Sequence, residues 1–159
     1  MAIEIERKFL VDTDRWHPDP GGGVLYRQGY LSTDPTVRVR IAGDKAVITI
    51  KGRPEGISRL EFEYPIPSDD ATILLDRLRR GQVVAKRRYR VPFEGDVWEV
   101  DVFEGDNAGL VIAEIELPSQ DTKVVMPPWI GREVTGDRRY SNASLAHHPF
   151  GEWRTAAHG

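Results

Sequence analysis

The sequence predicts a mainly β fold of the α+β class: an eight-stranded antiparallel β-barrel with a few helices packed outside. Apolar and charged residues alternate in eight short segments of the 159-residue chain, which is typical of strands with one apolar and one polar face. Glycine, proline and aspartate, which favour turns, separate these segments. Eight strands of this length fit a closed or nearly closed barrel, in which no sheet edge is left unpaired.

The first predicted strand begins at the amino terminus and carries the motif Glu4-Ile5-Glu6-Arg7-Lys8. Successive side chains of a strand point to opposite faces, so Glu4, Glu6 and Lys8 share one face while Arg7 lies on the other. The turn residues Gly43-Asp44-Lys45 predict a hairpin. The remaining predicted strands cover residues 24–31, 36–42, 46–51, 58–64, 82–91, 97–103 and 110–117.

One helix is predicted from Ser68 to Leu78. Ser68 is a favoured N-cap residue, acidic residues follow it in the first turn, and apolar residues recur at helical spacing until Gly81. Two shorter helices are predicted at residues 119–126 and 141–148, each followed by proline. The histidine pair at 147–148 is expected to end the second of these, because it has no zinc-site spacing to other ligands.

The length predicts a single domain of residues 1–159, with a core at about residues 2–148 and a tail at 149–159 that frays from Gly151 onward. Cysteine is absent, which excludes disulfides and thiolate metal sites and suits the cytoplasm. No apolar run is long enough to span a bilayer, so we expect a soluble protein without a targeting segment. The 22 basic against 25 acidic residues argue against a nucleic-acid partner.

Six of the predicted strands carry two like charges two residues apart. The acidic pairs are 4/6, 61/63, 99/101 and 114/116, and the basic pairs are 38/40 and 86/88. Like charges about 7 Å apart repel each other, which is unfavourable on an ordinary exposed strand. Alternation alone leaves two arrangements open: the apolar face fills the barrel, or the charges line its interior and helices cover the apolar outside.

An ionic interior needs compensation, because an unpaired buried charge costs several kcal/mol per ion. A ligand of both signs provides it: divalent cations on the carboxylates and a polyanion on the lysines and arginines. Mg²⁺ commonly joins one or two carboxylates to substrate phosphates, and arginine matches phosphate oxygens with its planar fork. This arrangement therefore predicts metal-assisted phosphoryl transfer. No glycine-rich phosphate loop is present, so side chains would hold the phosphates.

The charged motifs occur in a distinctive order. They are Glu4-x-Glu6-x-Lys8, Arg38-x-Arg40, Thr49-Ile50-Lys51, Glu61-x-Glu63, Lys86-x-Arg88-Tyr89, Asp101 and Glu114-x-Glu116. This set, running from residue 4 to about residue 145, resembles the CYTH superfamily, the triphosphate tunnel metalloenzymes. The resemblance implies an eight-stranded tunnel with the charged face inside, and an enzyme that hydrolyses or cyclises triphosphate compounds with Mg²⁺ or Mn²⁺, expected as two ions.

The resemblance assigns the basic residues to the triphosphate and the acidic residues to the metal ions, some of them through water. The expected substrate-binding residues are Lys8, Arg38, Arg40, Lys51, Arg59, Lys86, Arg88 and Arg139. The expected metal ligands are Glu4, Glu6, Glu61, Glu63, Asp101, Glu114 and Glu116. The expected catalytic residues are Glu6, Lys8, Lys86 and Arg88. The assignment of Arg59 and Glu99 to the site is based mainly on strand alternation. For Arg138 and Arg139, a position on the protein surface is the alternative.

Within the family, inorganic tripolyphosphate, cleaved to pyrophosphate and phosphate, is the predicted substrate, because compact bacterial members that begin close to the first motif resemble this chain most. Class IV adenylate cyclases carry a His-Phe pair before that motif, and this chain does not. Thiamine triphosphatases need a site for an aromatic base, whereas Trp98 is expected in the core. A non-catalytic polyphosphate or nucleotide sensor is a further alternative, which the full acidic set disfavours. A homodimer is left open.

Overall fold

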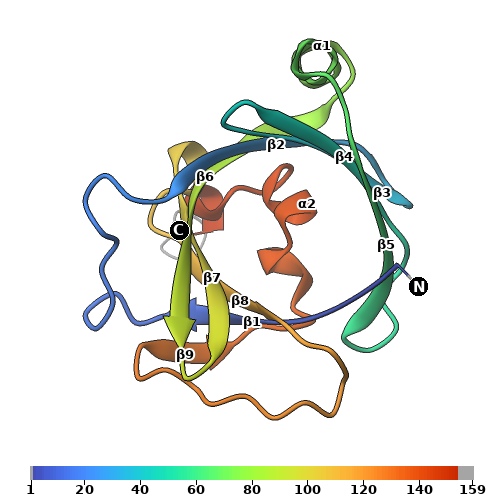
Figure 1. Cartoon of the computed structure of the whole chain (residues 1–159). Coiled ribbons are helices and arrows are strands. Elements are labelled where there is room, and N and C mark those ends of the chain that lie inside the picture. Colours follow the sequence, from blue (N-terminus) through green and yellow to red (C-terminus); the bar gives the residue numbers. More distant parts are fainter. Residues whose placement is uncertain (1, 154–159) are drawn as a thin grey trace.

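The computed structural model describes residues 2–153 (Figure 1). In this part of the chain the strands are β1 (Ile3–Val11), β2 (Val24–Thr33), β3 (Thr36–Ala42), β4 (Lys45–Lys51), β5 (Ser58–Pro65), β6 (Arg80–Phe93), β7 (Asp96–Phe103), β8 (Val111–Glu116) and β9 (Ile130–Glu133). The helices are α1 (Ser68–Arg77) and α2 (Asn142–Leu145), and the 3₁₀ turns are η1 (Gly105–Asn107) and η2 (Arg138–Tyr140).

The strands form one antiparallel sheet that closes on itself. Their order is β5-β4-β3-β2-β6-β7-β8-β1-β9, and β5 also pairs with β1. This last pairing, of residues 3–5 with residues 58–60, converts the first eight strands into a closed barrel, seen end-on in Figure 1. The predicted eight-stranded barrel is confirmed. The ninth strand, β9, was not predicted. It pairs with the carboxy-terminal end of β1, at Phe9 and Val11.

The paired charges of the strands point into the barrel, and most apolar side chains point outward. Near one end of the barrel apolar residues such as Val84 and Ile112 share the inward face with Lys86 and Glu114. Three apolar clusters lie against the wall. One is covered by α1, which packs on β2, β3 and β4 through Ala71 and Leu75. A second, around Phe9, Trp98 and Trp129, is covered by the segments near residues 16 and 124–130. Helices were expected to cover the outside, but most of the cover comes from loops and β9.

The third apolar cluster is formed by the carboxy-terminal segment. Tyr140 and Leu145 pack with Val84 and Leu110 near the ends of β6 and β8. The backbone N–H of Gln82 donates to the carbonyl of Ala146 at 2.7 Å. In the end-on view α2 lies within the ring of strands (Figure 1). The segment therefore closes against the barrel and brings α2 to its interior.

The predicted helices needed correction in detail. Pro67, not Ser68, occupies the N-cap position of α1, and the Ser68 hydroxyl donates instead to the carbonyl of Asp44. Helix α1 ends at Arg77, and Gly81 lies within β6. The carboxy-terminal helix is shorter than predicted, and residues 150–153 are helical where fraying was expected from Gly151; residues 154–159 lie outside the described part.

The helix predicted at residues 119–126 was wrong. This stretch contains only a turn at Ser119–Thr122, in which the Thr122 N–H donates to the carbonyl of Ser119. Val125 is exposed, so a helix here would have little apolar surface to bury. Trp98 is fully buried, as predicted. No helix of residues 2–153 is long and apolar enough to cross a membrane.

Candidate active site

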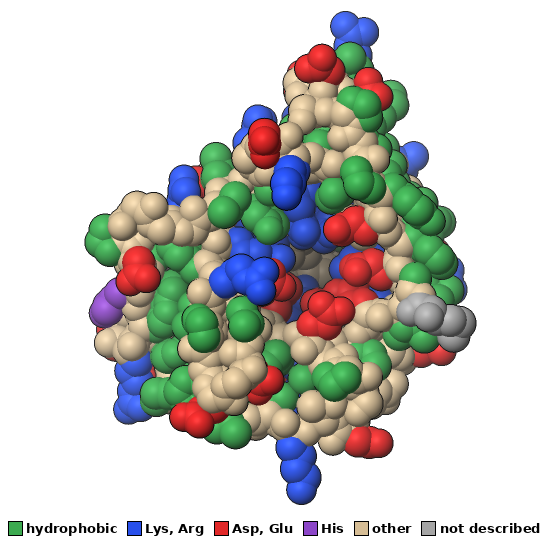
Figure 2. Space-filling model, viewed as in Figure 1, with side chains coloured by type: hydrophobic (Ala, Val, Ile, Leu, Met, Phe, Trp, Pro, Cys, Tyr) green, Lys and Arg blue, Asp and Glu red, His purple; other side chains and the backbone are tan. Residues whose placement is uncertain are grey.

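The interior of the barrel is a cavity of about 1020 Å³. Figure 2 shows it as a hollow whose wall is crowded with acidic and basic side chains. The residues that the sequence assigned to the site and that line the cavity are Glu4, Glu6, Lys8, Arg38, Arg40, Lys51, Arg59, Glu61, Glu63, Lys86, Arg88, Glu114 and Glu116, with Glu99 beside them. Alternation along the strands brought these side chains together from seven different strands.

Asp101 and Arg139 do not line the cavity. Asp101 is fully buried behind the wall, where it accepts two hydrogen bonds from Arg88 at 2.7 and 2.9 Å and lies 2.8 Å from Lys86 Nζ. Although burial alone would raise it, the neighbouring Lys86 and Arg88 hold the pKa of Asp101 below its usual range. In this geometry Asp101 is a counterion that orients two cations.

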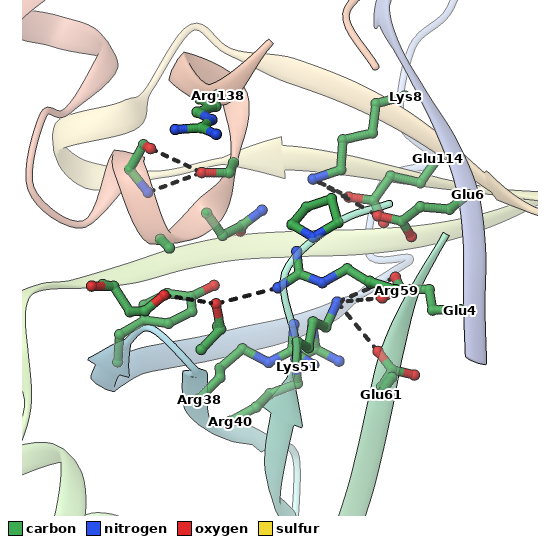
Figure 3. Close-up of a pocket in the computed structure, with 18 of the residues that line it drawn as sticks. Glu4, Glu6, Lys8, Arg38, Arg40, Lys51, Arg59, Glu61, Glu114 and Arg138 are labelled. Atoms are coloured by element: carbon green, nitrogen blue, oxygen red, sulfur yellow. Dashed lines mark hydrogen bonds and ion pairs between the residues drawn. The ribbon is translucent and has the colours of Figure 1, made fainter. Parts of the chain in front are cut away.

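Arg139 faces away from the cavity. Its guanidinium pairs with Asp137 at 2.7 Å and stacks over the rings of Tyr140 and Trp153. Its neighbour Arg138 lines the cavity instead and lies across from the charged strands in Figure 3. The surface position is therefore the one observed for Arg139, and the cavity position the one observed for Arg138.

The basic side of the cavity is formed by Arg38, Arg40, Lys86 and Arg88. Arg40 forms no ion pair with any carboxylate of residues 2–153. Its guanidinium stacks over the Tyr26 ring at 4.9 Å and donates a hydrogen bond to the neutral side chain of Gln28. Burial, then the nearby Arg38 and Arg88, lowers the pKa of Arg40 to about 10. Arg40 therefore lies beside other cations and without a carboxylate partner among the described residues, a position that an anion would stabilise.

Two guanidinium groups also have unused donors. The Nε–H groups of Arg38 and Arg59 are buried, and neither meets an acceptor in the described chain. A buried donor without a partner is costly, so each favours an incoming acceptor such as a phosphate oxygen. Arg59 otherwise donates to the Thr36 hydroxyl at 3.2 Å and lies among the cavity side chains in Figure 3.

Carboxylates crowd the opposite side, which Figure 3 shows around Lys8 and Lys51. Lys51 Nζ lies 2.8 Å from Glu4 and 3.2 Å from Glu61. Although burial would raise it, Lys51 lowers the pKa of Glu4 to about 2. For Glu61 the balance is opposite: burial and the Glu4 carboxylate raise its pKa.

The second acidic group surrounds Lys8, whose Nζ lies 3.9 Å from Glu6 and 3.6 Å from Glu114. Burial and the neighbouring Glu114 and Glu4 carboxylates raise the pKa of Glu6 well above its usual range, despite Lys8. Burial, followed by Glu4 and Glu99, likewise raises the pKa of Glu116. The acidic side thus holds more carboxylate than its lysines neutralise.

The carboxylates of the acidic side suit a divalent cation. Glu6 and Glu116 are directly opposed in the β1–β8 pairing, and Glu116 has no ion-pair partner among residues 2–153. Opposed carboxylates repel each other, and oxygen ligands are those that Mg²⁺ and Mn²⁺ prefer. In the described residues no three His, Cys, Asp or Glu side chains yet converge as a metal cage. Mg²⁺ often takes only one or two carboxylates together with substrate phosphates.

Lys86, on the basic side, is buried. Burial, with Arg88 adding to it and Asp101 opposing it, lowers the pKa of Lys86 to about 7. Its ammonium also donates to Asn142 Oδ1 at 3.1 Å. Lys86 is therefore held by one charged and one neutral acceptor.

Several residues of the site were not predicted from the sequence. Tyr26 and Asn142 line the cavity, and the fully buried Gln28 lies behind it, hydrogen-bonded to Arg40 and Asn142. Tyr26 and Gln28 lie on β2, whose alternation could have been followed as on the other strands. Asn142 had no such signal, since its contact with Gln28 joins residues 114 positions apart. His147 and His148 also line the cavity, just beyond α2.

Comparison with known proteins places these features in a family. The model of the CYTH domain matches residues 2–149. An inorganic triphosphatase of Acetivibrio thermocellus is 51% identical over 152 residues, covering 94% of this chain and 97% of its own length. An inorganic triphosphatase of Nitrosomonas europaea is 41% identical, covering 90% and 96%. A crystal structure of an inorganic triphosphatase, 38% identical, superposes with a TM-score of 0.64 over 90% of this chain and 97% of that one.

Proposed function

Because this chain belongs to the CYTH domain family, we propose that it is a metal-dependent inorganic triphosphatase, which hydrolyses tripolyphosphate to pyrophosphate and phosphate. The observation that carries the proposal is the composition of the cavity, in which a basic side faces a carboxylate-rich side within one hollow of the barrel. The two similar enzymes named as inorganic triphosphatases span almost the whole chain, which supports the choice of substrate class.

The basic residues of both sides of the cavity bind and orient the anion. A tripolyphosphate carries roughly four to five negative charges near neutral pH, given a terminal phosphate pKa near 6. Arg38, Arg40 and Arg88 supply planar donors, and Lys8, Lys51 and Lys86 supply point charges. These groups hold the chain in line for attack and neutralise the charge that grows on the leaving pyrophosphate. Arg138 is the further cation that the cavity geometry adds.

The acidic side holds the metal ions. We assign Glu4, Glu6, Glu61, Glu63, Glu114 and Glu116 to this role, with Asp101 acting through Lys86 and Arg88. Two Mg²⁺ or Mn²⁺ ions, when bound, supply charge neutralisation on the phosphates and acidify the attacking water. The water oxygen forms a bond to the terminal phosphorus, the bond from that phosphorus to the bridging oxygen breaks, and a carboxylate accepts the water proton. A cytoplasmic location and a homodimer stay predictions.

The test measures phosphate release from tripolyphosphate, ATP and thiamine triphosphate, each with Mg²⁺ and with excess chelator. We expect tripolyphosphate to be the best substrate and chelator to abolish turnover. Lys86→Ala and Glu6→Ala should each lower kcat/KM by about 10²- to 10³-fold, as for other groups that stabilise transition-state charge. Lys45→Ala is the matched control, since Lys45 is exposed outside the cavity, and it should leave kcat/KM unchanged.

Other outcomes would contradict the proposal. Faster turnover of thiamine triphosphate would indicate a different substrate, and cyclic AMP with pyrophosphate from ATP would indicate a cyclase. Tripolyphosphate binding without turnover would indicate a sensor. Full activity of Lys86→Ala or Glu6→Ala would remove the assigned roles.

A further inference from the structure

Two buried amide side chains connect two of the cations of the basic side. Gln28 on β2 is fully buried, and Asn142 is buried at the start of α2. Gln28 Nε2 donates to Asn142 Oδ1 at 3.0 Å. At one end, Arg40 Nε donates to Gln28 Oε1 at 2.9 Å; at the other, Lys86 Nζ donates to Asn142 Oδ1 at 3.1 Å. A continuous chain of hydrogen bonds thus runs from Arg40 to Lys86.

The cations at the two ends fix the orientation of both amides. Lysine and arginine side chains only donate hydrogen bonds, so the amide atoms that they contact must be oxygens. With both oxygens assigned, the central contact pairs an N–H of Gln28 with the oxygen of Asn142. The chain therefore has one consistent arrangement, and the usual ambiguity between amide oxygen and nitrogen does not arise.

The two amide side chains that link Arg40 to Lys86 are neutral, and this neutrality matters for the charge of the site. Aspartate in place of Asn142 would fill the same space and accept the same bonds from Gln28 and Lys86. Glutamate in place of Gln28 would still accept from Arg40, but it would lose the N–H that Gln28 donates to Asn142. The two carboxylates would also neutralise both cations, as Asp101 partly does for Lys86 and Arg88. Arg40 has no carboxylate partner in the part of the chain that the structure describes. Its neutral partner leaves the full positive charge available.

We propose that Gln28 and Asn142 are positioning residues of the substrate site, which hold Arg40 and Lys86 in place without adding negative charge to that already supplied by Asp101, and so leave the charge of Arg40 for the phosphate anion. The proposal rests on the proposed function and refines it. It makes α2 part of the site, because Asn142 reaches the barrel wall from the carboxy-terminal segment.

The test replaces the amides by carboxylates of nearly the same shape, in Gln28→Glu and Asn142→Asp. For each folded variant, kcat and KM for tripolyphosphate are measured with Mg²⁺, and Tm is measured without ligand. We expect KM to rise by about 10- to 100-fold, because weaker binding of the phosphate anion by the neutralised cations should cost about as much as one hydrogen bond to a charged group. We expect Tm of Asn142→Asp to stay the same or rise, because the buried cations gain a counterion and every hydrogen bond is kept. In Gln28→Glu the gained counterion is offset by the lost hydrogen bond to Asn142, so its KM should rise by more than any fall in Tm explains.

This combination separates positioning from packing. A residue that serves only to pack the interior would impair activity only with a lower Tm. Unchanged KM in folded Gln28→Glu and Asn142→Asp would overturn the proposal. If Asn142→Asp does not fold, Gln28→Glu decides alone, and Gln28→Met, which keeps the bulk without hydrogen bonds, should also raise KM.

Matched controls carry the same chemical change outside the cavity. Asn107→Asp alters a buried asparagine whose Oδ1 accepts from the Phe150 N–H, and Gln120→Glu alters an exposed glutamine near Ser58. Both should leave KM unchanged. A rise in KM equal to that of the cavity variants would mean that net charge alone is responsible, which would also overturn the proposal.

Failure of the proposed function gives a different result. If the unaltered protein does not hydrolyse tripolyphosphate, the role of the amides is measured by the rise in Tm that tripolyphosphate causes in the presence of chelator. A smaller rise in Gln28→Glu and Asn142→Asp than in the unaltered protein supports the positioning role. An equal rise in all three contradicts it.

Discussion

Arg7 and Lys8 are neighbours in the sequence but serve opposite sides of β1. Lys8 points into the cavity between Glu6 and Glu114 (Figure 3). Arg7 points outward, where its guanidinium makes two hydrogen bonds to Glu133 on β9 at 2.8 and 2.9 Å. A one-residue shift in the register of β1 would exchange these roles and place Arg7 in the cavity.

Arg7→Ala tests this assignment of faces. The variant should keep full tripolyphosphatase activity and lose roughly 0.5–1 kcal/mol of stability, the upper range for a partly exposed ion pair. The Arg7 bonds hold the pKa of Glu133 below its usual range. An acid with a lowered pKa in the folded state stabilises it above its unfolded pKa, near 4.3, and loses this effect as pH falls.

The stability difference between Arg7→Ala and the unaltered protein should therefore be present at neutral pH and shrink as the solution is acidified. Urea unfolding at several pH values measures it. A difference that persists at low pH would mean that Arg7 stabilises β1 through its cation–π contact with Phe9 and not through the ion pair with Glu133. Lost activity in a folded variant would contradict the strand assignment itself.

Local spacing explains which site residues could be found from the sequence. Pairs such as Glu4 and Glu6 reveal their shared face because strand alternation is a property of adjacent residues. The partners of Asp101, and the contrast between Arg138 and Arg139, depend on contacts between distant segments. The amide pair of Gln28 and Asn142 belongs to the same class, since uncharged residues stand out in no charge pattern.

At the scale of elements, Gly81 in β6 fixes the approach of the carboxy-terminal segment. Its φ is +72°, and a Cβ atom there would lie 2.6 Å from the carbonyl oxygen of Ala146. That carbonyl accepts the Gln82 N–H, just beyond α2. A side chain at position 81 must therefore displace the segment that carries Asn142.

Gly81→Ala should lower the free energy of unfolding by about 1–3 kcal/mol, from backbone strain and the contact with Ala146 together. KM for tripolyphosphate should rise with it. Gly43→Ala is the matched control: Gly43 has a similar φ of +62° but no atom within 4 Å of the added Cβ. Gly43→Ala should lower the free energy of unfolding through backbone strain but leave KM for tripolyphosphate unchanged. Equal KM values for the two variants would contradict the link between Gly81 and the site.

The strands and α1 were predictable because their patterns repeat over several residues, and several bounds agree with the structure to within a residue or two. Strand β9 is only four residues long and lacks alternation, so its pairing with β1 depends on tertiary contact. The stretch 119–126 packs on the second apolar cluster through Val124 and leaves Val125 exposed, so it docks without forming a helix. Short elements of this kind are set by packing more than by local preference.

At the scale of the whole molecule, the barrel is closed unevenly. Strands β1 and β5 share three residue pairs, whereas β1 and β8 share five and β6 and β7 share eight. The outer face near this closure is also left exposed, with Leu60, Phe62 and Ile50 on its surface. Lys51 lies inside the same closure and joins Glu4 of β1 to Glu61 of β5.

We expect this closure to open more readily than the rest of the sheet. Amide hydrogens of residues 3–5 and 58–60 should exchange with deuterium faster than those of β6 and β7 in the free protein. Adding Mg²⁺ and pyrophosphate should slow exchange at the closure most. Equal protection of both regions without ligand, or no response to it, would contradict this expectation.

The pairing of β1 with β5 also links chemistry to folding. Glu4 and Glu61, which Lys51 joins across this short seam, are among the carboxylates assigned to the metal ions. A cation that binds both would therefore bridge the first strand of the barrel to the strand that closes it. Occupancy of the cavity then contributes directly to holding the chain in its closed state. The concentration of metal and polyphosphate around the protein would set its lifetime against unfolding as well as its turnover.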